Sequence, residues 1–124
     1  MNIPGDLKYT KTHEWIKIDG NKAKVGITDF AQHEITDVVH VELPDAARIV
    51  KKNQPAAVVE SVKSAFDIYS PLSGKISEVN EDLHSSPELL NQSPYEKGWL
   101  FTVEFTDANE LKDFLGADDY KKII

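Results

Sequence analysis

The chain has 124 residues, 40% of them hydrophobic and 28% charged, and we expect one domain spanning residues 1–124 with a modest core. Its formal net charge of −7 at pH 7 argues against nucleic acid and against an anionic membrane surface as partners, because both need clustered Lys and Arg. The chain has no cysteine, which excludes disulfides, thiolate nucleophiles and cysteine-based metal sites.

The first residues show no targeting pattern. Residues 1–6 lack the basic and apolar regions of a signal peptide and the arginine-rich character of a transit peptide, and no later stretch has the length and apolarity of a membrane span. We therefore expect a cytoplasmic protein of bacterial type, with a processed organellar form as the alternative.

Short segments with the pattern of β-strands follow one another along the chain, separated by turn residues. The last is the clearest, because apolar and polar positions alternate between Trp99 and Phe105 with the period of two expected when one sheet face packs on a core. The expected strands are residues 13–18, 22–26, 38–43, 55–61, 65–70, 75–79 and 99–105. Their close spacing predicts an all-β sandwich or flattened barrel.

Helical patterns are short and lie between or after the expected strands. Thr28 can N-cap a turn or two, and Pro87 stands where the first position of another short helix is expected. Asp107 and Glu110 resemble a capping box that begins a C-terminal helix, with Gly116 as its end. We expect short peripheral helices and one C-terminal helix around the sheets.

Lys63 occupies the expected tip of a hairpin between residues 55–61 and 65–70. Two-residue hairpin loops favour Asn-Gly or Asp-Gly, because these residues tolerate positive φ. We interpret a lysine at this place as an attachment point for a covalent group. The alternative is an ordinary solvated surface charge.

Signals of catalysis or metal binding are weak elsewhere in the chain. The four histidines, His13, His33, His40 and His84, are scattered without the spacing of a metal site, and we expect surface or structural roles for them. The sequence contains neither a glycine-rich phosphate loop nor the elbow motif of a serine nucleophile. We therefore predict no catalytic residue, no metal site and no enzyme activity.

The hairpin and its flanks carry a recognisable set of residues. The stretch from Glu60 to Ala65, followed by Asp67 to Gly74, resembles the lipoyl-lysine hairpin of the glycine cleavage system H-protein family. Further similar stretches occur in the order of that family at residues 13–15, 26–32, 41–44, 78–81, 86–91, 93–95 and 98–99. The resemblance implies the barrel-sandwich hybrid fold of lipoyl and biotinyl carriers.

By this resemblance, the protein is a carrier whose Lys63 is joined to lipoate through an amide. Its implied partners are a pyridoxal-phosphate-dependent glycine decarboxylase that loads an aminomethyl group, an aminomethyltransferase that passes the one-carbon unit to tetrahydrofolate, and a dihydrolipoamide dehydrogenase. The resemblance also implies a lipoate-attaching enzyme, for which Glu60 and Ser61 would help to identify the hairpin. We expect a monomer, because one exposed arm must visit three active sites.

The resemblance further implies a cleft in which the loaded arm is shielded from water. The matching positions are Thr12, Glu14 and Asp67, whose hydroxyl and carboxylate groups would accept hydrogen bonds from a protonated amine. The alternative for the two acidic residues is plain surface charge.

Three positions depart from the family's common pattern. Thr36 and Ala47 stand where glycines are common, and Glu34 stands where a histidine is often found. If those glycines take positive φ, we expect the backbone to change at residues 36 and 47 and the cleft to differ in shape.

Other functions are compatible with a hairpin lysine. Biotin carriers usually flank the lysine with methionines, whereas Val62 and Ser64 stand here. Lipoyl domains of 2-oxoacid dehydrogenases are usually shorter and attached to further domains. The protein could also be a lipoate donor that passes lipoyl groups to other enzymes, or a structural adaptor without a modified lysine.

Overall fold

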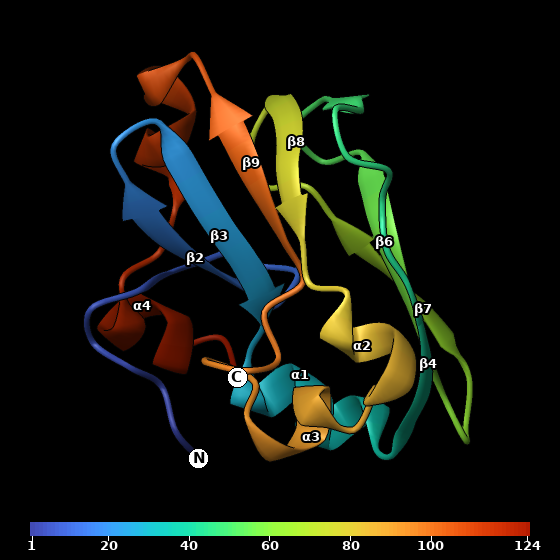
Figure 1. Cartoon of the computed structure of the whole chain (residues 1–124). Helices are drawn as coiled ribbons and strands as arrows, with labels where there is room; N and C mark the ends of the chain where they lie inside the picture. Colours follow the sequence, from blue (N-terminus) through green and yellow to red (C-terminus); the bar gives the residue numbers. More distant parts are fainter.

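The computed structural model describes residues 1–124 as two antiparallel β-sheets that face each other (Figure 1). The larger sheet comprises, in spatial order, β1 (Lys8–Tyr9), β2 (Glu14–Asp19), β3 (Lys22–Ile27), β9 (Phe101–Phe105), β8 (Gly74–Val79) and β5 (Ile49–Val50). The smaller sheet comprises β4 (Val38–Glu42), β6 (Pro55–Ser61) and β7 (Ala65–Tyr69). Neither sheet closes on itself, and the all-β prediction is confirmed as a sandwich of two open sheets.

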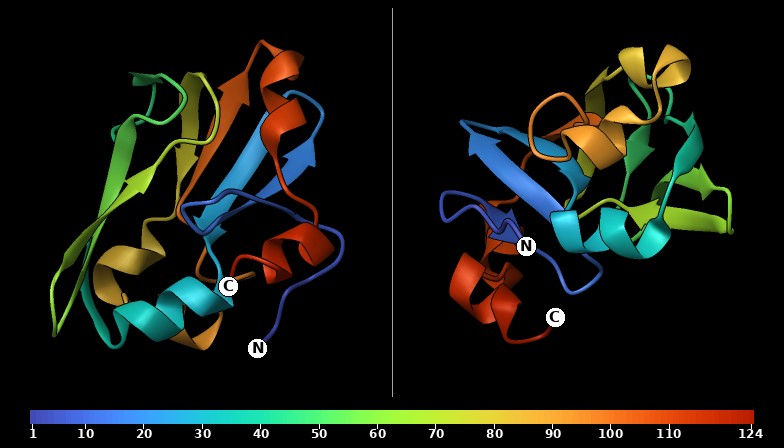
Figure 2. Two further views of the ribbon diagram at one scale, coloured as in Figure 1. Left: turned by 180° about the vertical axis from the view of Figure 1, so that it is seen from behind. Right: turned by 90° about the horizontal axis from the view of Figure 1, so that it is seen from below.

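Five short helical segments surround the sandwich. The helices α1 (Asp29–Ile35), α2 (Asp82–Ser85) and α3 (Leu89–Gln92) lie across one end of both sheets, which is the lower end in Figure 1. The helix α4 (Ala117–Lys121) lies beside the outer face of the larger sheet, whereas the 3₁₀ helix η1 (Ala108–Asp113) packs Leu111 against the core between the sheets. Figure 2 shows both segments from behind. None of these helices has the length and apolarity needed to cross a membrane.

Two clusters of buried side chains hold the layers together. The larger, of 21 buried residues, fills the space between the sheets and includes Phe101, Val103 and Phe105 of β9, as the alternating pattern predicts. The smaller lies outside the larger sheet, under α4, and consists of Ile3, Leu7, Tyr9, Trp15 and Tyr120. Burial of these apolar side chains is the main stabilising contribution to such a sandwich.

The expected strands agree with the observed ones to within about two residues, which is the usual uncertainty of an element's ends. The strands β1 and β5 are not predicted, because two residues are too few to show an alternating pattern. Trp99 is only partly buried and precedes β9, where the ammonium of Lys24 lies 5.0 Å from the centre of its ring.

The observed helix caps agree with the sequence predictions better than the observed helix ends do. The hydroxyl of Thr28 accepts a hydrogen bond from the N–H of Ala31 and begins α1 as predicted. Asp107 caps η1, but Glu110 does not complete a capping box, because its carboxylate accepts from the backbone N–H and hydroxyl of Ser73. Gly116 precedes α4 rather than ending a helix.

The two residues that replace common glycines keep the backbone conformation that glycine favours. Thr36 has φ 69° with ψ −152°, and Ala47 has φ 71°. The expected change of backbone at these positions is therefore wrong, and the chain accepts a strained conformation instead. A side chain in this region costs on the order of 1–3 kcal/mol.

We expect Thr36→Gly to stabilise the protein by about 1 kcal/mol, because relief of the strained φ exceeds the added entropy of glycine in the unfolded chain. Thr36 is exposed, and its side chain makes no hydrogen bond. Urea unfolding measures the change, and Thr106→Gly at an exposed site with negative φ is the matched control, which should lose stability. A lower unfolding midpoint for Thr36→Gly would contradict the assignment of strain.

Candidate functional site

The tip of the β6–β7 hairpin is a tight turn built around Ser61. Glu60 of β6 pairs with Ala65 of β7, which leaves four residues to reverse the chain. The Ser61 hydroxyl accepts hydrogen bonds from the N–H groups of Lys63 and Ser64 at 3.1 and 3.2 Å, and the Ser61 N–H donates to the Ser64 carbonyl at 2.8 Å. No residue of this turn has positive φ, which explains why neither Gly nor Asn is needed there.

A second set of contacts ties the tip to the end of α1. The N–H of Val62 donates to the carbonyl of Asp37 at 3.1 Å, and the ammonium of Lys63 donates to the carbonyl of Glu34 at 3.2 Å. Lys63 is exposed, and Val62 beside it is 70% exposed. Figure 1 shows the hairpin projecting at the lower right of the molecule. The lysine is thus presented at a corner by a turn that is fixed from both sides.

An apolar cavity of about 400 Å³ lies between α1 and β7, and Glu34 borders it. The sequence prediction placed Thr12 and Asp67 in a common cleft, and both line this cavity. The ammonium of Lys63 donates to the carbonyl of Glu34 and so contacts a residue of the cavity lining. The full lining is Thr12, His13, Ile27, Phe30, Ala31, Glu34, Ile35, Phe66, Asp67 and Ile68.

Glu14 lies behind Thr12, in the wall of a neighbouring cavity of about 340 Å³ that Thr12 also lines. One carboxylate oxygen accepts from the hydroxyls of Thr10 and Thr12 at 2.6 and 2.5 Å, and the other accepts from the N–H of Tyr69 at 3.4 Å. Glu14 is 2% exposed and pairs with no cation. Burial raises its pKa, and the hydrogen bonds from Thr10 and Thr12 oppose that shift.

The three predicted cleft residues are therefore close together but not equivalent. Thr12 touches both cavities, Asp67 opens into the apolar one, and Glu14 contributes a buried carboxylate behind Thr12. A buried carboxylate without a cationic partner is a favourable site for an ammonium group, which would supply the missing charge.

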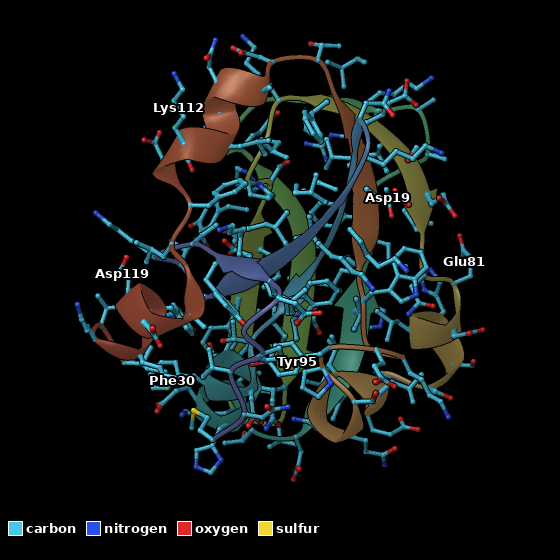
Figure 3. All side chains as sticks on the ribbon, turned by 90° about the vertical axis from the view of Figure 1, so that its left-hand side faces the viewer. Asp19, Phe30, Glu81, Tyr95, Lys112 and Asp119 are labelled. Carbon is cyan, nitrogen blue, oxygen red and sulfur yellow. The ribbon has the colours of Figure 1, made fainter.

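The sequence did not identify the apolar part of this cavity or the place of His13 in its wall. Phe30 of α1 also belongs to this wall, and Figure 3 shows it near the end of the molecule where α1 and α4 approach each other. The only sequence signal for His13 was its position between Thr12 and Glu14, two of the predicted cleft residues. His33, His40 and His84 are exposed, and no group of three His, Cys, Asp or Glu side chains is placed to hold a metal ion.

Two open sheets that face each other, with an exposed lysine at the tip of a hydrogen-bonded hairpin, define a fold of the lipoyl-carrier, barrel-sandwich class. Comparison with known proteins narrows the class. The family model described as glycine cleavage H-protein matches residues 7–124. The chain therefore belongs to the glycine cleavage H-protein family.

Individual relatives agree with that assignment over at least 97% of their length. The chain is 76% identical to the glycine cleavage system H protein of Endomicrobium trichonymphae, over 100% of both chains. It is 48% identical to that of Bacillus subtilis strain 168, over 99% of this chain and 97% of the relative. The crystal structure of the H protein from Mycobacterium marinum is 36% identical, covers 97% of both chains and superposes with a TM-score of 0.88.

Proposed function

We propose that the protein is the lipoyl carrier of a glycine cleavage system, with lipoate joined by an amide to Lys63. The observation that supports this most directly is exposed Lys63, presented on a hydrogen-bonded turn and in contact with Glu34, which lines an apolar cavity. When bound, lipoate supplies the thiol–disulfide chemistry that a chain without cysteine lacks. The protein itself supplies a fixed attachment point and is not an enzyme.

The residues present fit such an arm. The cavity beside Lys63 is lined by Ile27, Phe30, Ala31, Ile35, Phe66 and Ile68, which suit an aliphatic chain. Thr12 and Asp67 offer acceptors at its polar side, and the carboxylate of Glu14 adds negative charge behind Thr12. An amine cargo carried into this cleft would exchange water for these acceptors, and exclusion of water would slow its premature loss.

The hairpin also suits recognition by a lipoate-attaching enzyme. Glu60 is partly exposed and can be contacted directly, whereas the Ser61 hydroxyl is occupied inside the turn. We infer that Glu60 acts through its charge and that Ser61 acts by giving the tip its shape. The proposed partners are this enzyme, a pyridoxal-phosphate-dependent glycine decarboxylase, an aminomethyltransferase and dihydrolipoamide dehydrogenase, each met by a monomeric cytoplasmic carrier.

Intact-protein mass and peptide mapping test the proposal on protein produced with a lipoate-attaching enzyme and lipoate. We expect one lipoyl amide, located at Lys63, and none on the other lysines. Biotin at Lys63 would place the protein in carboxylase chemistry, and an unmodified lysine would favour an adaptor. A lipoylated protein that fails to support glycine cleavage but loads other lipoyl enzymes would favour the lipoate-donor alternative.

A further inference from the structure

A chain of hydrogen bonds connects the C-terminal helix to the wall of the apolar cavity. The N–H of Ala31 donates to the Thr28 hydroxyl at 3.2 Å, the Thr28 and Tyr120 hydroxyls lie 2.7 Å apart, and the Tyr120 hydroxyl lies 2.8 Å from Nδ1 of His13. Tyr120 and His13 are 107 positions apart in the sequence. These hydrogen bonds thus connect α1, α4 and the segment before β2 at one place.

The number of available hydrogens determines which group donates in each of these hydrogen bonds. Thr28 is fully buried, and its hydroxyl oxygen contacts only the N–H of Ala31 and the hydroxyl of Tyr120. Because the N–H of Ala31 is a donor, the Thr28 hydrogen has only the Tyr120 oxygen as acceptor. The hydrogen of the equally buried Tyr120 hydroxyl is then directed to Nδ1 of His13. The neutral imidazole that satisfies every group carries its hydrogen on Nε2.

The ring of His13 is held firmly in this orientation. Its backbone has φ 71°, a strained value for a residue other than glycine. The His13 N–H donates to the carbonyl of Thr10, and the His13 carbonyl accepts from the N–H of Thr28. The ring packs against Phe30, with centroids 4.9 Å apart, and against the edge of Tyr120 at 5.8 Å. Backbone strain of this kind tends to occur where a site must be positioned.

The same contacts oppose protonation of His13. A second ring hydrogen would have to be placed on Nδ1, which already accepts from Tyr120, and the buried hydroxyl has no other acceptor. Burial lowers the pKa of His13, and the charge of Glu34 partly counteracts this effect. The other ionisable groups at this place are Asp67 in the same cavity and Glu14, the next residue along the chain.

We propose that Tyr120 is a positioning residue for the arm cleft, because it holds His13 as a neutral Nε2–H tautomer and keeps a positive charge out of the wall. This inference rests on the proposed function, in which the cleft receives a protonated amine. Thr12 and Asp67 line the cavity as acceptors for such an amine and Glu14 adds negative charge behind Thr12, whereas a protonated His13 beside them would repel the amine. The C-terminal helix would then affect the cleft without contacting the arm.

The first test uses unmodified protein, so that it does not depend on lipoate. Nitrogen-15 NMR of the imidazoles reports the tautomer of His13 and its titration. We expect the Nε2–H tautomer in the unaltered protein, and in Tyr120→Phe a mixture of tautomers with a raised pKa, since the donor to Nδ1 is lost. Tyr95→Phe is the matched control, because this hydroxyl bonds Asp29 and Asn2 but not His13. An Nδ1–H tautomer in the unaltered protein would overturn the proposal, as would a His13 signal that Tyr120→Phe leaves unchanged.

The second test uses the loaded carrier and follows spontaneous loss of the amine at about pH 6 and pH 8, on either side of the ordinary histidine pKa. We expect Tyr120→Phe to lose the amine about threefold faster than the unaltered protein at the lower pH only. His13→Asn should abolish this difference in the double variant, since Asn tolerates positive φ and does not titrate. Equal loss from Tyr120→Phe at both pH values would overturn the proposal. An absence of lipoyl at Lys63 would instead contradict the proposed function, and the NMR result would stand.

Discussion

We expect replacement of Lys63 by Arg to reduce glycine cleavage by the reconstituted system to background. Arginine keeps the positive charge and can donate to the Glu34 carbonyl as lysine does, so the hairpin should be unchanged. Its guanidinium stays protonated at neutral pH and cannot form the amide with lipoate. The measurement is release of labelled carbon dioxide from glycine in the presence of the three partner enzymes, with the variant and the unaltered carrier treated alike by the lipoate-attaching enzyme.

Lys52→Arg is the matched control for this prediction. Lys52 pairs with Asp113 at 2.9 Å, and its replacement should leave glycine cleavage close to that of the unaltered protein. Urea unfolding of Lys63→Arg should give the same midpoint as the unaltered protein, because an exposed lysine contributes little to stability. Retained glycine cleavage by Lys63→Arg would place the attachment point elsewhere or favour a function without one.

Much of the fold could be predicted from local sequence patterns, and the hairpin illustrates why. The strand β6 spans the residues predicted from sequence, because its bounds depend on β-branched residues and on turn residues next to them. The cap at Thr28 could be predicted equally well, since the acceptor and the N–H that it binds are three residues apart. Lys63 stood out because of its position at the tip, although the turn proved to need no positive φ.

The features that escaped prediction depend on contacts between distant residues. The capping box at Asp107 is incomplete because Ser73, from another loop, binds the carboxylate of Glu110. The role of His13 depends on Tyr120 at the other end of the chain, and no local pattern reports that pair. Likewise, nothing in the sequence distinguishes the buried Glu14 from the exposed Asp67, because only the packed sheets determine which carboxylate is removed from water.

The burial of Glu14 leads to a prediction in which stability and function change in opposite directions. Burial raises the pKa of Glu14 above its ordinary value of 4.5, so the folded protein binds a proton more tightly than the unfolded chain does. The contribution of this group to stability is therefore greatest below pH 4.5 and is lost as the pH rises through the folded pKa. At neutral pH the buried carboxylate therefore lowers the stability of the folded protein.

Glu14→Gln should stabilise the protein at pH 7 by about 1 kcal/mol, a typical value for exchanging buried hydrogen-bonding groups. The amide can accept from the N–H of Tyr69 and donate to the hydroxyl of Thr10 or Thr12, so no buried group loses its partner. Urea unfolding at pH 7 and at low pH measures the effect, which should disappear at low pH, where Glu14 is protonated in both states. Glu42→Gln, at an exposed position, is the control and should be neutral. A destabilised Glu14→Gln at pH 7 would contradict the predicted cost of the charge.

The same variant should lose a loaded amine about tenfold faster than the unaltered carrier, because a hydrogen bond to a charged partner is worth about 1.5–3 kcal/mol. Unchanged loss of the amine would remove Glu14 from the proposed cleft. A carboxylate that lowers stability in the free carrier and prolongs the life of its cargo is retained for the loaded state, since stability alone would favour glutamine. In this interpretation, the ammonium of the cargo neutralises the unpaired negative charge of Glu14 when the arm occupies the cleft.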